Sequence, residues 1–144
     1  PAFDFRNPET VDFLLQDAAH WIADFGLDGY RLDAVKHIRP DFWWRFRTHM
    51  RDTFPEARHY FVGETFQNRN GIAAFVGPNM LDGQFDFPLY DNLMECFALD
   101  TAGFVELEAS LRESEAVYGR STRMSPLLGN HDIFNRTCSV KFWS

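Results

Sequence analysis

Residues 29–37 read Gly-Tyr-Arg-Leu-Asp-Ala-Val-Lys-His, and this stretch decides how the rest of the chain is interpreted. Its apolar residues predict a short strand that begins after a turn at Asp28-Gly29. Because alternate side chains of a strand share a face, Arg31 and Asp33 point the same way as Val35. The arginine favours the ionised form of the aspartate. Two interpretations stay open: a structural ion pair, or a carboxylate kept charged at a strand end, as a nucleophile must be.

Composition limits the function classes. The chain has 144 residues, of which 45% are hydrophobic, and a formal net charge of -7, which suits one globular core. The acidic balance argues against a nucleic-acid partner, and no apolar run is long enough to cross a membrane. The chain opens at Pro1 without a methionine or a signal-like segment, so we expect the natural N-terminus to lie outside this sequence. Cys96 and Cys138 lack metal-ligand spacing and are predicted to be buried, reduced thiols, which leaves the compartment (secreted or cytoplasmic) open.

Helices and strands are predicted to alternate along the chain. A helix begins at Asn7-Pro8 and ends at Gly26, because Asn caps a first turn that contains Pro, and Gly suits the stop. The remaining elements follow the same reasoning: strands near 60–64, 82–87 and 125–130, and helices near 41–54, within 69–80, and at 92–99 and 104–111. This order predicts an α/β fold in which crossover helices connect parallel strands.

Three carboxylates lie at or just after the ends of predicted strands: Asp33, Glu64 and Asp132. In a parallel sheet these ends share one side, so the three acids are expected to converge, as active-site residues do in (β/α)8 barrels. Asp33 beside Arg31 suits a nucleophile. Glu64 follows apolar residues and would face other carboxylates, and both influences favour the protonated form that a general acid needs. Two such acids are what glycoside hydrolysis uses, and a separation of about 5 Å would mean retention of configuration.

At these residues the chain resembles the α-amylase family, glycoside hydrolase family 13. Gly29 to His37 resembles its nucleophile strand, Gly63-Glu64-Thr65 its general-acid motif, and Leu128 to Asp132 its third-carboxylate motif. Residues 82–90 resemble the strand between the last two motifs, so the resemblance covers nearly the whole chain.

The resemblance implies a role for each of seven residues. Asp33 would be the nucleophile, Glu64 the acid/base and Asp132 the transition-state stabiliser, while Arg31 would orient Asp33 and His131 would hydrogen-bond the sugar. Lys36 and His37 would hold the leaving-group side of the substrate; the alternative is that they form a solvated strand exit.

The resemblance also implies a calcium ion, held by an acid before the nucleophile strand and by the backbone carbonyl of His37. The usual acid position falls on Ala2, which leaves Asp4 as the nearest carboxylate. Asp4 has a competing interpretation as the cap of a turn.

Only about four of the eight barrel strands are predicted, and the family's first motif would lie before Pro1. Residues 1–144 are therefore predicted to be one partial catalytic (β/α)8 barrel domain, a fragment of a longer chain. The arginine that follows the family's last motif is displaced here to Arg136, which receives no role.

The resemblance predicts a retaining hydrolase of α-1,4-glucosidic bonds in starch-like α-glucan oligo- or polysaccharides. The alternatives are a transglycosylase or sugar isomerase with the same three acids, or a non-catalytic binding relative. The sequence leaves linkage preference, chain-length preference and oligomeric state open.

Overall fold

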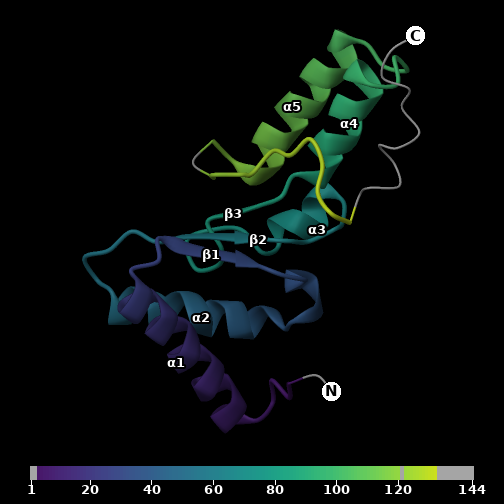
Figure 1. Cartoon of the computed structure of the whole chain (residues 1–144). Helices are drawn as coiled ribbons and strands as arrows, with labels where there is room; N and C mark the ends of the chain where they lie inside the picture. The colour runs from purple at the N-terminus through teal and green to yellow at the C-terminus, as the bar shows by residue number, and fades with distance from the viewer. Residues whose placement is uncertain (1–2, 121, 133–144) are drawn as a thin grey trace.

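A small parallel sheet forms the centre of the molecule (Figure 1). The computed structural model describes residues 3–120 and 122–132. Within them the sheet has three strands, β1 (Gly29–Leu32), β2 (Tyr60–Gly63) and β3 (Gly83–Gln84), in that order. Leu32 pairs with Gly63, and Gly63 pairs with Gln84, so the carboxyl ends of all three strands lie at the same edge.

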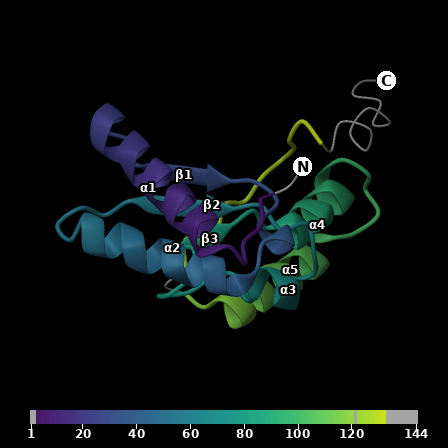
Figure 2. The ribbon, with the colours of Figure 1, turned by 90° about the horizontal axis from the view of Figure 1, so that it is seen from below.

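The helices fall into two groups. Helices α1 (Pro8–Phe25) and α2 (Pro40–Thr53) lie together on one side of the sheet, and a 3-10 turn, η1 (Val35–His37), precedes α2 (Figures 1 and 2). A short helix, α3 (Arg69–Ala73), connects β2 with β3. Helices α4 (Phe87–Phe97) and α5 (Phe104–Tyr118) pack against each other away from α1 and α2. No helix in the described part of the chain is both long and apolar enough to span a membrane.

Helix α1 begins and ends as the sequence predicts. The Asn7 side chain accepts a hydrogen bond from the backbone N–H of Glu9 at 3.0 Å, which satisfies one of the unpaired donors of the first turn. At the other end Gly26 has a φ of 62°, and its N–H donates to the Ile22 carbonyl. Four side chains at helical spacing are buried against the rest of the protein: Val11, Leu15, Ala19 and Ile22.

An apolar cluster joins α1, α2 and the sheet. Phe61 of β2 is 1% exposed, and its ring meets the ring of Phe46 from α2 edge-on, with 5.0 Å between centroids. Trp43 of α2 donates its indole N–H to the Val35 carbonyl at 3.1 Å, which fixes η1 on the helix. Burying each aromatic side chain of this kind contributes about 1.5–3 kcal/mol. The cluster therefore holds the turn after β1 in a fixed position.

Close approach of β1 and β2 requires glycine. Gly29 has a φ of 153°, and a Cβ built on it would lie 1.8 Å from the Tyr60 carbonyl oxygen. A Cβ on Gly63 would lie 2.4 Å from the side-chain nitrogen of Gln84 on β3. A side chain at Gly29 would therefore push β1 away from the backbone of β2, whereas one at Gly63 would first have to displace the side chains of Gln84 and Leu81.

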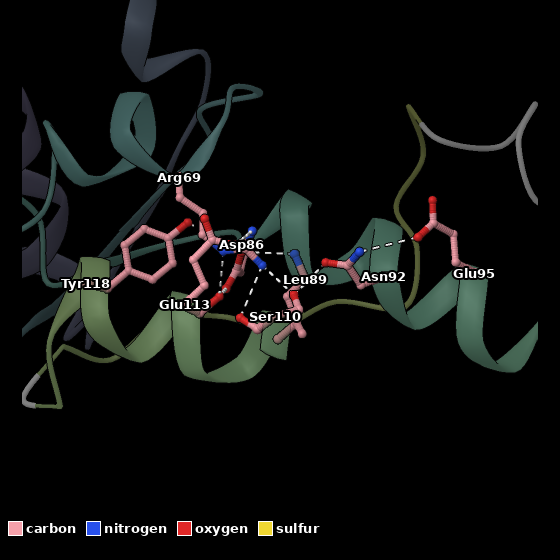
Figure 3. Close-up of polar contacts among 9 residues, drawn as sticks. Arg69, Asp86, Leu89, Asn92, Glu95, Ser110, Glu113 and Tyr118 are labelled. Atoms are coloured by element: carbon pink, nitrogen blue, oxygen red, sulfur yellow. Dashed lines mark hydrogen bonds and ion pairs between the residues drawn. The ribbon is translucent and has the colours of Figure 1, made fainter. Parts of the chain in front are cut away.

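A buried carboxylate, Asp86, organises the second group of helices (Figure 3). It is 2% exposed and caps α4 by accepting from the N–H of Leu89 at 3.1 Å. It also accepts from Ser114 Oγ at 2.9 Å and from the Tyr118 hydroxyl at 3.4 Å, both on α5. Burial and then the negative charge of Asp86 raise the pKa of Tyr118, so the phenol keeps the proton that it donates.

Arg69 of α3 extends this polar network. Its guanidinium donates to Ser114 Oγ at 3.0 Å, contacts Ser110 and pairs with Glu113 at 2.9 Å (Figure 3). Ser110 in turn donates to the side-chain oxygen of Asn92 on α4. Helices α3, α4 and α5 are therefore joined by hydrogen bonds and ion pairs between side chains. Helices α1 and α2, by contrast, are joined to the sheet by apolar contacts.

The predicted strand at 125–130 is wrong. The structure has a single parallel bridge there, between Phe85 and Ser125, and Pro126 follows without the N–H that a continuing ladder would need. The described residues thus contain three of the four predicted strands.

Other predicted boundaries shift as well. The first predicted strand ends at Leu32, because Ala34 adopts a φ of 49° and Val35 begins η1 instead of sharing a strand face with Asp33. The predicted strand at 82–87 shortens to β3, since Asp86 caps a helix that starts at Phe87 and not at 92. Helix α5 runs to Tyr118 and not to 111.

The predicted buried thiol of Cys96 is half-buried. Ala2, Arg136 and Cys138 lie outside the described residues.

Candidate active site

The turns after β1 and β2 place Asp33 and Glu64 beside each other. The strands are parallel and in register, so both carboxylates follow the same edge of the sheet. The N–H of Glu64 donates to the Leu32 carbonyl at 2.9 Å, and the N–H of Val35 donates to the Glu64 carbonyl at 3.0 Å. These two backbone hydrogen bonds connect the turns directly.

Arg31 of β1 contacts both carboxylates. Its Nη1 donates to Asp33 Oδ1, and its Nη2 lies 2.9 Å from Glu64 Oε1. The guanidinium also lies over the ring of Phe85, 5.9 Å from its centroid. Since a guanidinium is planar and compact, two carboxylates that share it lie close together. The contact with Glu64 was not predicted, because the sequence gives no indication of which carboxylate a strand arginine reaches across the sheet.

The two carboxylates differ in exposure. The Asp33 side chain is 71% exposed, whereas the Glu64 side chain is only 13% exposed. The hydrogen bond from Arg31 lowers the pKa of Asp33, and hydrogen bonding with the Glu64 side chain and the charge of His131 lower it further. Asp33 is thus a solvent-facing carboxylate held in its ionised form, as the sequence predicts, and Glu64 is an inward-facing neighbour.

The third predicted segment reaches the same edge. The amide nitrogen of Asn130 lies 3.4 Å from Glu64 Oε1, and its amide oxygen accepts from the backbone N–H of Asp132 at 3.0 Å. His131 Nε2 lies 3.3 Å from Asp132 Oδ2, and both side chains are largely exposed. Asp132 is therefore held beside Glu64 through its neighbour Asn130. Sequence reasoning assigned no role to Asn130, although its place in the third motif pointed to this contact.

Lys36 and His37 lie in η1, next to Asp33. Lys36 Nζ donates to the Phe66 carbonyl at 3.0 Å, which connects the segment after β1 with the segment after Glu64. His37 is exposed. Both residues therefore border the edge that carries the carboxylates, and their contact with a substrate stays a prediction.

Asp4, the carboxylate predicted to bind calcium, is engaged by Arg6. Both oxygens of Asp4 interact with Arg6, whose Nε and Nη2 donate at 3.0 and 3.3 Å. Among the described residues no group of three or more His, Cys, Asp or Glu is arranged to hold a metal ion. Calcium ligation by Asp4 and the His37 carbonyl stays a prediction.

The chain matches known proteins along most of its length. The family model of the alpha-amylase catalytic domain matches residues 1–141. Two similar relatives come from Dictyoglomus thermophilum: Alpha-amylase 2 is 28% identical over 132 residues, and Alpha-amylase 3 is 35% identical over 121 residues. These alignments cover 92% and 77% of this chain but 23% of each relative.

A solved structure shares the arrangement of the elements. The cyclic alpha-maltosyl-(1→6)-maltose hydrolase from Arthrobacter globiformis, in complex with maltose, is 27% identical with a TM-score of 0.82. The alignment covers 96% of this chain and 31% of that one. The chain therefore spans less than a third of the proteins that it resembles.

Proposed function

The chain belongs to the alpha-amylase catalytic-domain family and forms part of its (β/α)8 barrel, and on that premise we propose that the whole protein is a retaining glycoside hydrolase of α-glucans. The bond that we propose for cleavage is the α-1,4-glucosidic bond of starch-like chains. One observation supports this most: Arg31 contacts an exposed, ionised Asp33 and an enclosed Glu64 at the same edge of the sheet.

The proposed reaction has two steps. Asp33 attacks the anomeric carbon, and Glu64 gives its proton to the leaving glycosidic oxygen, which forms a covalent glycosyl-enzyme. Glu64, now a carboxylate, takes a proton from water as the water attacks the same carbon and releases Asp33. Arg31 positions both groups, since it contacts each of them.

The third segment and η1 supply the remaining proposed roles. Asp132 stabilises the positive charge that develops on the sugar ring, and His131 hydrogen-bonds that sugar. The contact between Asn130 and Glu64 supports this assignment, because it holds the segment beside the acid. Lys36 and His37 bind the leaving-group side of the glucan.

The stereochemistry of the first product tests the proposal. The full-length protein is mixed with a maltooligosaccharide, and proton NMR follows the anomeric signals during the first minutes. A retaining enzyme releases the α-anomer first, which then mutarotates. Initial release of the β-anomer, or no cleavage of any α-glucan, would contradict the proposal.

Cyclic glucans form a second candidate substrate class. Relatives of similar identity are named cyclomaltodextrinase, and the solved hydrolase described above is named for cyclic alpha-maltosyl-(1→6)-maltose. Comparing initial rates on linear and cyclic glucans of equal glucose content decides between the two. Chromatography of the products separates hydrolysis from transglycosylation and isomerisation, because hydrolysis gives shorter products, transfer gives products longer than the substrate, and isomerisation gives products of the same length.

A further inference from the structure

The arginines of this chain divide into two groups. Eleven of them lie within the described residues, and eight of these form an ion pair with a carboxylate. The remaining three have no carboxylate partner among the described residues: Arg51, Arg58 and Arg123. In a chain with a net charge of -7, carboxylates are abundant, so these three are exceptions.

All three exceptions line one cavity. This cavity has a volume of about 420 Å³ and lies between the end of α2, the segment before β2 and the segments around β3. Arg51 comes from α2, Arg58 precedes β2, and Arg123 precedes the bridge at Ser125, so three separate parts of the chain contribute one arginine each. The volume is in the range of small-molecule sites.

The only carboxylate in the described lining of this cavity is already used. Asp82 accepts two hydrogen bonds from Arg47, at 2.6 and 2.8 Å, and a third from the Phe61 N–H at 2.9 Å. It therefore balances Arg47 and leaves the charges of the other three arginines uncompensated within the cavity.

Local structure explains only one of the three charges. Arg51 lies in the last turn of α2, where the helix dipole favours a cation without any ligand. Arg58 and Arg123 lie outside helices. The backbone carbonyl of Arg123 accepts from the Tyr60 hydroxyl, which anchors its main chain beside β2, where both residues line the cavity.

We propose that this cavity binds a phosphate group, either as inorganic phosphate or as part of a phosphorylated sugar. Guanidinium groups pair with phosphate oxygens through two parallel hydrogen bonds, and several of them around one cavity favour an oxyanion over a neutral sugar. The cavity surrounds the amino end of β2, whereas Asp33 and Glu64 follow the carboxyl ends of the strands. It is thus separate from the site that handles the neutral glucan.

The test is a calorimetric titration of the full-length protein. Inorganic phosphate, glucose 6-phosphate and glucose are titrated separately, and we expect saturable binding of at least one phosphate compound and none of glucose. A higher affinity for glucose 6-phosphate than for phosphate identifies the sugar ester as the ligand, and the reverse order identifies the free ion.

Matched substitutions locate the binding. Arg58→Gln and Arg123→Gln should each weaken binding by about tenfold or more, since each removes a charge-assisted contact. Arg112→Gln is the control, because it removes the same charge from an exposed ion pair with Glu108 on α5. A loss of binding in the control equal to that in Arg58→Gln would mean non-specific attraction and would overturn the proposal. So would the absence of saturable phosphate binding to the unmodified full-length protein.

Discussion

Aspartates at the two ends of the sheet differ in their exposure to solvent and in the number of hydrogen bonds that they accept. At the carboxyl end, Asp33 is 71% exposed and contacts Arg31. At the amino end, Asp82 is 23% exposed and accepts three hydrogen bonds, two from Arg47 and one from Phe61. Farther along the chain, Asp86 is fully enclosed and also accepts three.

The difference shows how a carboxylate is assigned to structure or to chemistry. An ionised carboxylate accepts about four hydrogen bonds. Around Asp82 and Asp86 the protein supplies most of these hydrogen bonds, so each carboxylate stabilises the fold and can accept few more from a ligand. At Asp33 the protein supplies fewer of them and the carboxylate faces solvent, so a substrate can still bind to it.

The largest expected effect is on catalysis. Asp33→Asn in the full-length protein should lower kcat on starch by at least about a thousandfold, because the amide cannot act as the nucleophile. The melting temperature should stay close to that of the unmodified protein, because the carboxylate is exposed. Both quantities come from a reducing-sugar assay and thermal denaturation of the same preparation.

Asp41→Asn is a matched control for this substitution. Asp41 is 58% exposed and pairs with Arg39 at 2.8 Å across the same sequence spacing as Asp33 and Arg31, but at the start of α2. It should retain full activity. Full activity of Asp33→Asn would contradict the proposed mechanism. Equal losses of activity in both variants would show that the assay responds to surface charge.

The second effect is on stability. Asp86→Ala should lower the free energy of unfolding by about 3 kcal/mol or more, because it removes a helix cap and leaves two buried hydroxyl donors without an acceptor. Urea denaturation of the full-length protein measures the change. Asp12→Ala removes an exposed ion pair with Arg45 and should change stability by less than about 1 kcal/mol. Equal effects of the two substitutions would mean that the network around Asp86 contributes nothing specific.

A smaller effect is expected at Asp82. Asp82→Asn should cost about 2 kcal/mol of stability, since it weakens the charge-assisted pair with Arg47 and keeps the side-chain volume. A double-mutant cycle with Arg47→Gln checks the cause, because a coupling of about 1 kcal/mol or more shows that the two side chains act together. Additive effects would contradict a direct contact.

Sequence reasoning succeeded where the signal is local. The ends of α1 follow from Asn7, Pro8 and Gly26, which act on backbone groups a few residues away. Asp33 and Glu64 follow strand ends in the structure as in the prediction, because each is preceded by a short apolar run with glycine nearby.

It failed where contacts between residues that are distant in the sequence determine the local structure. The alternating residues before Phe87 suggested a strand, yet the buried donors of α5 make Asp86 the cap of a helix. The segment at 125–130 has strand-like residues and only one bridge, since Pro126 interrupts the donors and pairing depends on the neighbouring segment. The contact of Arg31 with Glu64 joins two neighbouring strands, so no local pattern in the sequence indicates it.

The pH dependence of catalysis gives the smallest and most specific test. The hydrogen bond from Arg31 is the main cause that lowers the pKa of Asp33 below its ordinary value of 3.8. A nucleophile must be ionised, so its contribution to kcat/KM is present above its pKa and is lost as the pH falls through that value. Removing the guanidinium raises that pKa.

The acid limb of the kcat/KM profile of Arg31→Gln should therefore move to higher pH. Arg39→Gln removes the corresponding partner of Asp41 and should leave the limb in place. An unmoved limb in Arg31→Gln would mean that Asp33 is ionised for another reason, because this hydrogen bond is the largest single cause of its lowered pKa. A shift in both variants would instead point to the net charge of the protein as the cause.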